Sequence, residues 1–309
     1  MIHNDTPPPA KREAFRKALA SERLLQFPGA FTPLSARLIE RHHFDGVYVS
    51  GAVISAELGL PDIGLTTLSE VASRTQEISR VTELPTLVDA DTGFGEPMNV
   101  ARTVRMMEDV GATAIHIEDQ VNPKRCGHLD GKTVVDDDTA VKRIRAAVGA
   151  RRDRNFLIVA RTDMRSLEGP TAALKRALAL EDAGADAIFP EALEGIREYE
   201  MFVEKLKIPV IANMTEFGKS DLIPRNQLES AGVKIAIYPV SLLRLSMKAV
   251  DQGLNSLREA GSFQASLQHM QTRAELYELL DYESYNQFDS NIYNFTLSET
   301  HSPNTTESS

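Results

Sequence analysis

The chain has 309 residues, of which 42% are hydrophobic and 25% are charged, and it contains one cysteine. This length can bury a sizeable core, as one large domain or as two ordinary ones. The formal net charge of -10 argues against a general nucleic-acid binder, because phosphate contacts need clustered Lys and Arg. We find no apolar run of about 20 residues and no export signal, so we expect no membrane partner. A lone thiol cannot form an internal disulfide, which favours the cytoplasm.

The first predicted elements are a polar segment and a series of short strands. Residues 1–12 are polar, include three consecutive prolines, and are expected to be flexible. Eight short apolar segments with strand character follow. They span residues 25–27, 46–49, 86–89, 114–117, 157–160, 187–189, 210–212 and 234–237.

Helical periodicity separates these strands. Apolar residues lie three and four positions apart in segments 97–110, 139–150, 171–183, 196–206 and 225–231. Gly111, Gly184 and Gly232 stand near three of the helix ends, where glycine commonly terminates a helix. Strict alternation of strand and helix predicts a mostly parallel sheet. Eight such units in about 250 residues fit a (β/α)8 TIM-type barrel better than an open doubly wound sheet. No GxGxxG follows the first strand, which weakens a dinucleotide-binding alternative.

The predicted domain organisation is one α/β barrel over residues 13–297. Its helical region from about residue 242 to residue 280 is longer than one barrel helix needs. We expect this extra length to cap the barrel or to pack on a neighbouring subunit. Residues 298–309 are rich in Ser, Thr and Asn and are predicted to be a disordered tail.

Polar residues recur where the predicted strands end, and these ends carry the active site of a barrel. Asp89 and Asp91 are two apart on a strand, so both point to one face. Two adjacent carboxylates repel each other unless a cation or a proton intervenes, and Mg²⁺ commonly uses one or two carboxylates. Because Glu118 of the next strand falls within reach, we favour a metal site over a helix cap. His116 shares a face with Glu118 and is interpreted as an interior histidine.

Two further residues indicate chemistry. Arg161 follows a buried-type strand, where a cation is expected to meet a carboxylate of the protein or of a substrate. Cys126 lies between two cations and a histidine, in the sequence Lys-Arg-Cys-Gly-His at 124–128. Nearby positive charge lowers the pKa of a thiol toward neutrality, so that the thiol can donate or accept a proton. The alternative is a small buried hydrophobe, which the polar flanks disfavour.

Nine stretches together form a recognisable pattern. They are Tyr-Val-Ser-Gly (48–51), Leu-Gly-Leu-Pro-Asp (58–62), Val-Asp-Ala-Asp-Thr-Gly-Phe-Gly (88–95), His-Ile-Glu-Asp-Gln (116–120), Lys-Arg-Cys-Gly-His (124–128), Ala-Arg-Thr-Asp (160–163), Phe-Pro-Glu-Ala (189–192), Asn-Met-Thr-Glu-Phe-Gly (213–218) and Met-Gln-Thr-Arg (270–273). Over about residues 14–288 the chain resembles the isocitrate lyase/phosphoenolpyruvate mutase superfamily. Any one stretch alone would be a weak signal.

The resemblance implies roles for particular residues. Asp89 and Asp91 would hold Mg²⁺, with Mn²⁺ as an alternative and Glu118 as a third ligand. Cys126 would be the catalytic acid/base, Tyr48 a candidate base for a substrate hydroxyl, and Arg161 a further catalytic residue. The implied substrate-binding residues are Ser50, Gly51, Ala52, Cys126, Gly127, His128, Arg161, Glu191, Asn213, Thr215, Arg244 and Arg273, with Phe189 and Pro239 near a substrate methyl group.

The resemblance also implies a reaction. We expect Mg²⁺-dependent cleavage of (2S,3R)-2-methylisocitrate into pyruvate and succinate, as in propionate degradation by the methylcitrate cycle. A tricarboxylate substrate explains three arginines in an acidic protein. The resemblance further implies a homotetramer that exchanges its C-terminal helices.

Three alternatives stay open. Isocitrate lyases share the pattern but are generally longer. Mutases, hydrolases and decarboxylases of the superfamily typically lack the cysteine in the loop. A non-catalytic metabolite-binding barrel would leave the charged strand ends without a reason.

Overall fold

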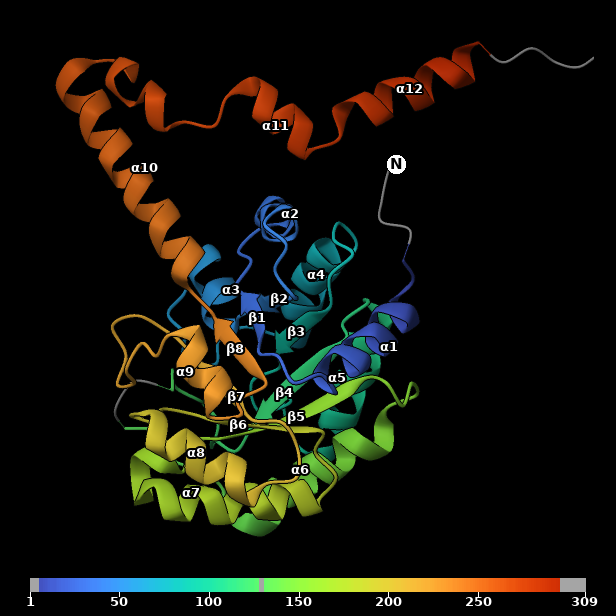
Figure 1. The fold of residues 1–309 in the computed structure, drawn as a ribbon, viewed down its shortest axis with the longest axis vertical. Coiled ribbons are helices and arrows are strands. Elements are labelled where there is room, and N and C mark those ends of the chain that lie inside the picture. Colours follow the sequence, from blue (N-terminus) through green and yellow to red (C-terminus); the bar gives the residue numbers. More distant parts are fainter. Residues whose placement is uncertain (1–5, 128–130, 295–309) are drawn as a thin grey trace, which may run out of the picture.

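The structure is a computed structural model that describes residues 6–127 and 131–294. Eight strands alternate with helices around a common axis (Figure 1). The strands are β1 (Leu25–Pro28), β2 (Val47–Val49), β3 (Thr86–Asp89), β4 (Ala114–Glu118), β5 (Leu157–Thr162), β6 (Ala187–Pro190), β7 (Ile211–Asn213) and β8 (Ile235–Tyr238). They coincide with the eight predicted segments to within one or two residues.

The strands close into a barrel. Parallel pairing runs from β2 through β6 in order, and from β7 through β8 to β1. Two parallel bridges, between Gly29 and Tyr48 and between Ile188 and Val210, join these two sets. The predicted (β/α)8 barrel is thereby confirmed.

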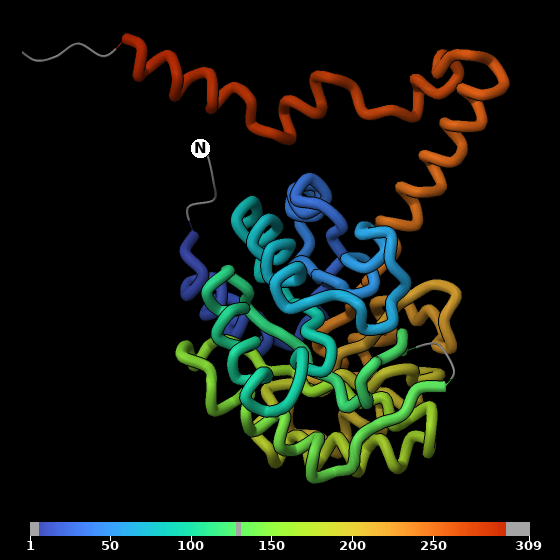
Figure 2. Tube along the Cα trace, turned by 180° about the vertical axis from the view of Figure 1, so that it is seen from behind, coloured from blue at the N-terminus to red at the C-terminus, as the bar shows by residue number. Residues whose placement is uncertain are grey.

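Helices cover the outside of the barrel, as Figure 2 shows from behind. They are α2 (Pro33–Arg41), α3 (Gly51–Glu57), α4 (Leu68–Ser79), α5 (Pro97–Asp109), α6 (Asp137–Ala150), α7 (Arg165–Asp182), α8 (Ile196–Lys205) and α9 (Arg225–Ser230). The expected helices match, except that α7 begins six residues before residue 171. Gly169, whose φ of 84° is not helical, separates the first turn of α7 from the rest of the helix. No described helix combines the length and apolar character that a membrane crossing requires.

The strand register decides which residues reach the site. Alternate side chains of the strands point into the barrel, and those near the strand starts are apolar, among them Leu87, Ala114, Leu157, Ala187 and Ile211. Side chains of one strand alternate with a period of two. The same interior parity therefore brings Asp89, Glu118, Arg161, Glu191 and Asn213 to the carboxyl ends of their strands.

The N-terminal helix α1 (Pro8–Leu19) covers the opposite end of the barrel. Its Phe15 packs on Phe27 of β1, with ring centroids 5.2 Å apart, and is 1% exposed. Lys11 donates to the carbonyl oxygen of Ser79 at 2.9 Å, and Arg12 donates to that of Glu108 at 2.7 Å. Residues 8–12 are thus helical, and both cations are buried, contrary to the expected flexible segment. Sequence reasoning missed this because the segment is polar.

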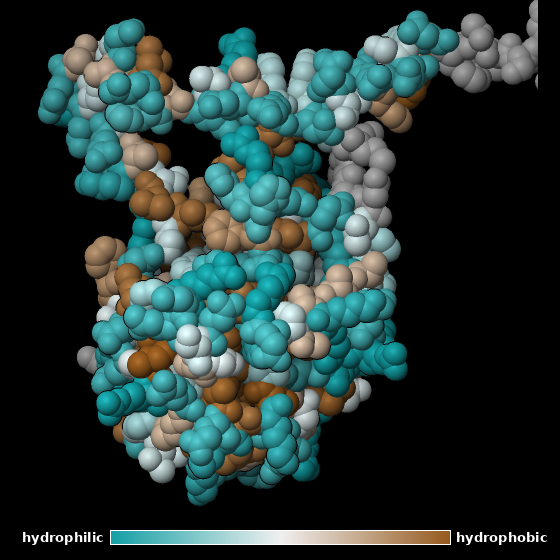
Figure 3. Space-filling model, viewed as in Figure 1, coloured by the Kyte–Doolittle hydropathy of each residue, from teal (hydrophilic) through white to brown (hydrophobic). Residues whose placement is uncertain are grey.

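The C-terminal helices leave the barrel as an arm (Figure 1). The arm comprises α10 (Ser241–Ala260), a 3-10 helix (Gln264–His269), α11 (Arg273–Leu279) and α12 (Tyr282–Tyr293). No residue of α10 or α12 is buried. Apolar side chains on the arm are visible in Figure 3, and the arm returns to the barrel where Arg37 of α2 donates to the carbonyl oxygen of Leu279 at 3.2 Å. The predicted tail, residues 298–309, lies outside the described residues.

Replacing the buried aromatic ring of α1 tests its packing. We predict that Phe15→Ala lowers the free energy of unfolding by about 3–5 kcal/mol, because it removes a large buried side chain and leaves a cavity. Urea denaturation measures the change. Phe217→Ala is the matched control, since Phe217 is 95% exposed and its loss should cost less than about 0.5 kcal/mol. Equal costs for the two variants would contradict the packing role of α1.

Candidate active site

Two carboxylates and a lysine meet after β3. Asp89 accepts hydrogen bonds from the backbone N–H groups of Gly51, at 3.2 Å, and of Asp91, at 3.0 Å. A Cβ atom on Gly51 would lie 3.0 Å from the Asp89 carboxylate, so only glycine allows this approach without displacement. Nζ of Lys124 lies 2.7 Å from Oδ1 of Asp91 and also binds Asp62. Sequence reasoning placed Asp62 and Lys124 in its motifs but assigned neither of them to the site.

The two aspartates differ in proton affinity. Burial favours the neutral form of Asp89, but His116, Lys124 and Arg161 together outweigh burial and lower its pKa to about 2. Burial and the neighbouring Asp89 raise the pKa of Asp91 to about 6. Although burial opposes it, the carboxylates around Lys124 raise the pKa of its ammonium group well above the ordinary value. Lys124 is thus the positive partner of several carboxylates, and this part of the site has an excess of negative charge.

This charge excess fits a divalent cation. Mg²⁺ is commonly bound by one or two carboxylates, with water and substrate completing its shell. Burial and the nearby Asp89 outweigh the attraction of Lys124 in raising the pKa of Asp91. Among the described residues, no three His, Cys, Asp or Glu side chains form a group that could hold a metal ion. Asp89 and Asp91 are consistent with the expected site, whereas the expected set of three with Glu118 is not assembled.

Glu118 instead faces Arg161, at the end of β5. Its Oε2 lies 3.3 Å from Nε of Arg161, and its buried Oε1 has no hydrogen-bond partner among the described residues. Burial raises the pKa of Glu118 well above its usual range. A buried carboxyl group that lacks a full set of partners is more stable when protonated. The protonated form of Glu118 is therefore favoured in the cluster around Arg161.

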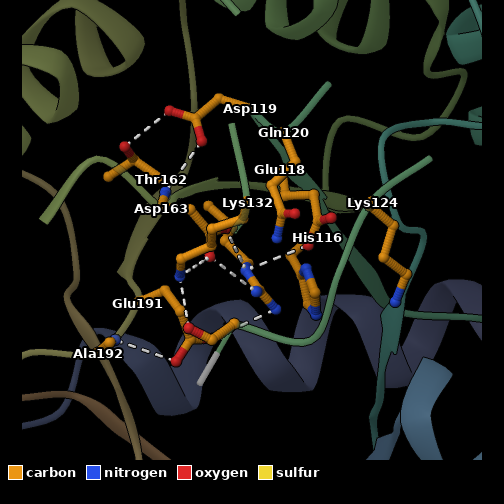
Figure 4. Close-up of polar contacts among 12 residues, drawn as sticks. His116, Glu118, Asp119, Gln120, Lys124, Lys132, Thr162, Asp163, Glu191 and Ala192 are labelled. Carbon is orange, nitrogen blue, oxygen red and sulfur yellow. Dashed lines mark hydrogen bonds and ion pairs between the residues drawn. The ribbon is translucent and has the colours of Figure 1, made fainter. Parts of the chain in front are cut away.

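Arg161 connects the carboxylates of three strand ends. Besides Glu118, it contacts Asp163, with Nε 3.0 Å from Oδ2, and Glu191, with Nη1 3.3 Å from Oε2. Figure 4 shows this cluster with Lys124 standing at its other side. The guanidinium carbon also lies 5.2 Å from the ring centroid of Phe189. A buried, permanently charged fork of this kind suits carboxylate recognition.

The Cys126–Gly127 segment lies against this cluster. A Cβ atom on Gly127 would lie 2.5 Å from Nη2 of Arg161 and 2.6 Å from Glu191, so any larger residue would push the segment away. Cys126 is partly exposed and lines the same pocket as Arg161. The arrangement therefore brings a thiol and a guanidinium group to one small space.

Tyr48 lines that space and is paired with the buried His116. The hydroxyl group of Tyr48 lies 2.7 Å from Nε2 of His116, and the two rings are stacked with centroids 5.9 Å apart. His116 is completely buried, as expected for an interior histidine, and burial lowers its pKa to about 4. Burial and Asp89 raise the pKa of Tyr48 well above 10. A phenol that stays protonated can donate a hydrogen bond but cannot accept the proton of a substrate hydroxyl. The expected role of Tyr48 as a hydroxyl base therefore lacks support.

The pocket at these strand ends has a free volume of about 50 Å³. That is room for a few water molecules only, so the pocket has to widen before a tricarboxylate can enter. Of the expected residues, it is lined by Tyr48, Ser50, Ala52, Asp89, Cys126, Gly127, Arg161, Phe189, Glu191, Asn213, Thr215 and Pro239. A larger, mostly apolar cavity of about 820 Å³ lies between α2 and α10, and Glu216 is the one Asp, Glu, Lys or Arg residue among the described residues that line it.

Five expected residues do not line this pocket, namely Gly51, Asp91, Glu118, Arg244 and Arg273. Arg244 donates to the carbonyl oxygen of Glu216 at 2.8 Å and also pairs with the Glu216 carboxylate at 2.8 Å. Arg273 begins α11 on the arm and is exposed. His128 lies outside the described residues. Arg244 is next to Thr215, at 3.4 Å, and so borders the pocket without lining it.

Comparison of the sequence with known proteins identifies the family of this chain. The phosphoenolpyruvate phosphomutase family model matches residues 15–258. Two proteins of Corynebacterium glutamicum, named as probable 2-methylisocitrate lyases, are 54% and 56% identical to this chain; each alignment covers 94% of this chain, and 94% and 95% of those proteins.

Solved structures agree with this assignment. A crystal structure of 2,3-dimethylmalate lyase has a TM-score of 0.86 and 31% identity, over 96% of this chain and 100% of that one. Phosphonopyruvate hydrolase, solved with oxalate and Mg²⁺, has a TM-score of 0.82 and 29% identity, over 92% and 99%. The chain therefore belongs to the phosphoenolpyruvate phosphomutase family.

Proposed function

We propose that this protein is a Mg²⁺-dependent carbon–carbon lyase that cleaves (2S,3R)-2-methylisocitrate into pyruvate and succinate. One observation carries the proposal: Cys126 lines the same pocket as Arg161 and Asp89. A lyase of a tricarboxylate needs a carboxylate anchor, a stabiliser of alkoxide charge and a proton donor. Identities of 54% and 56% to probable 2-methylisocitrate lyases support this substrate. A place in propionate degradation by the methylcitrate cycle is part of the same proposal.

The mechanism assigns a task to each group. Asp89 and Asp91 would hold Mg²⁺, which supplies electrostatic stabilisation of alkoxide charge when bound. Arg161 pairs with a substrate carboxylate through its fork of N–H donors. The substrate hydroxyl gives its proton to water, the electron pair of the O–H bond forms the C=O bond of pyruvate, and the C2–C3 bond breaks. Its electron pair passes to the succinate half, and Cys126 Sγ–H supplies the proton that this carbon needs.

Apolar residues would distinguish 2-methylisocitrate from isocitrate by contacting the extra methyl group. Phe189 and Pro239 line the pocket. A methyl contact discriminates between substrates by only about 1–3 kcal/mol. Slow cleavage of isocitrate is therefore expected beside the main reaction.

Substrate and metal dependence test the proposal together. We predict that the purified protein with Mg²⁺ releases pyruvate from 2-methylisocitrate faster than glyoxylate from isocitrate, and that EDTA stops both reactions. Lactate dehydrogenase coupling follows either 2-oxo acid. Preference for isocitrate would show that the roles given to Phe189 and Pro239 are wrong. No cleavage of either compound would favour a decarboxylase or hydrolase of the family.

The metal ligands can be tested separately. Asp91→Asn should lower kcat/KM by about 100-fold or more, because even the outer partners of metal ligands are worth 10–100-fold. Asp138→Asn is the matched control, since that side chain is 76% exposed on α6 and far from the chemistry. Higher Mg²⁺ concentrations should partly restore the Asp91 variant. A variant with wild-type kinetics at low Mg²⁺ would refute the role of Asp91.

The proton donor has its own test. Cys126→Ser should abolish turnover while succinate binding, followed by calorimetry, stays close to that of the wild type. A hydroxyl group is a much weaker acid than a thiol, although the two are similar in size. Retention of more than a tenth of the wild-type rate would exclude Cys126 as the acid.

We also propose that the protein is a homotetramer in which the arm packs on neighbouring copies. Met247, Val250, Leu254 and Leu257 of α10 are 37–58% exposed and recur at three- and four-residue spacing, so they share one helix face. Monomers rarely expose contiguous apolar surfaces of this kind. A catalytic thiol must stay reduced, so we place the enzyme in the cytoplasm.

Light scattering after gel filtration measures the assembly. We predict a mass four times the 34.1 kDa of one chain, and a smaller mass for Leu254→Glu, which puts a charge into the apolar face. Gln252→Glu, at an exposed position of the same helix, is the control and should stay tetrameric. A wild-type mass of 34.1 kDa would contradict the proposal.

A further inference from the structure

Lys132 is a buried cation to which the proposed mechanism gives no task. Its side chain is 2% exposed. Its ammonium group donates to the carbonyl oxygen of Gly127 and to Oδ1 of Asp163, the latter at 2.7 Å. Lysine is almost never fully buried unless it is paired. Figure 4 shows Lys132 on the Asp163 and Glu191 side of the cluster, away from Lys124.

One partner of Lys132 is a fixed point of the barrel. Asp163 is fully buried at the end of β5, and its backbone N–H donates to Oδ1 of Asp119 at 2.9 Å. Asp119 in turn accepts from Thr162 at 2.7 Å and from Arg176 at 2.9 Å. The Asp163 carboxylate therefore has a position that the surrounding strands and helices determine.

The other partner of Lys132 is Gly127, in the Cys126–Gly127 segment. Gly127 follows Cys126 directly, and its Cα lies so close to Arg161 and Glu191 that no Cβ would fit. On the N-terminal side of Cys126, Gln120 binds Arg125 through the Arg125 carbonyl and amide groups, both at 2.9 Å. On the C-terminal side of Cys126, the Lys132 ammonium group binds the residue that directly follows the thiol.

We propose that Lys132 is a positioning residue, which ties the carbonyl oxygen of Gly127 to the Asp163 carboxylate and thereby holds Cys126 beside Arg161. The effect on turnover rests on the proposed function. The effect on the position of the thiol does not, because it follows from the contacts of Lys132 alone. A purely structural lysine would stabilise the fold without changing the access of reagents to Cys126.

The single cysteine of the chain allows a direct measurement of that position. The rate of Cys126 alkylation by iodoacetamide is followed as a function of pH, and the limiting rate at high pH is compared between proteins. At that limit the thiol is fully ionised, so differences report access and not pKa. The chain has no other thiol, so every S-alkylated cysteine found by mass spectrometry is Cys126.

Four proteins are compared with the wild type. Lys132→Met keeps the length of the side chain and removes its charge, Lys132→Arg restores a cationic donor, and Lys132→Met combined with Asp163→Asn removes both charges of the pair. The control is Lys142→Met, because Lys142 is 61% exposed and pairs with Asp138 on the surface. The double variant guards against misfolding, because it removes one positive and one negative charge and so keeps the net charge of the buried cluster unchanged.

The expected pattern separates positioning from stability. Lys132→Met should raise the limiting alkylation rate at least tenfold and lower kcat at least 30-fold, and Lys132→Arg should recover a third or more of the wild-type kcat. The double variant should melt near the wild-type temperature and still alkylate at least tenfold faster, because Gly127 still lacks its donor. Lys142→Met should match the wild type.

Two results would overturn the inference. One is a folded Lys132→Met whose alkylation rate and kcat both stay within threefold of the wild type. The other, decisive if that variant does not fold, is a double variant that alkylates at the wild-type rate. If the wild type cleaves no 2-methylisocitrate, the proposed function fails, and the alkylation rates still decide the role of Lys132.

Discussion

The site depends on one buried guanidinium group. Arg161 lies within 3.3 Å of carboxylates from Glu118, Asp163 and Glu191, which come from three successive strand ends. Without this cation the three acidic groups could not be buried side by side, because an unpaired buried charge costs far more than folding can supply. The cation in turn needs the fixed ends of a closed barrel to keep its partners in place. Fold and chemistry therefore constrain each other at the end of β5.

The same constraint explains how charge is distributed across the site. Arg161 serves one side, where Lys132 shares Asp163 with it, and Lys124 serves the other, where Asp62 and Asp91 lie. The neutral preference of Glu118 and the raised pKa of Asp91 mark where positive charge runs short. The proposed tricarboxylate substrate would therefore need both the arginine and the proposed metal ion as positive partners.

Much of this arrangement follows from the sequence. Strand positions follow from short apolar segments and helix-ending glycines, and the spacing of Asp89 and Asp91 indicates their common face. The alternation of side chains along each strand then indicates that Glu118, Arg161 and Asn213 point into the barrel at the carboxyl ends of their strands. Sequence alone does not reveal Lys132 with Asp163, since this contact joins a loop to a strand 31 residues away. Nor does it reveal that Lys11 and Arg12 bind carbonyl oxygens at the far end of the barrel.

A crystal structure of the protein with Mg²⁺ and succinate tests the central claim most directly, namely that the strand ends around Arg161 form a metal-assisted carboxylate site. The account predicts a ligand carboxylate on the Arg161 guanidinium, a metal ion beside Asp89 and Asp91, and Cys126 facing the ligand. Succinate bound elsewhere, for example in the apolar cavity between α2 and α10, with Arg161 contacting only protein carboxylates, would contradict it.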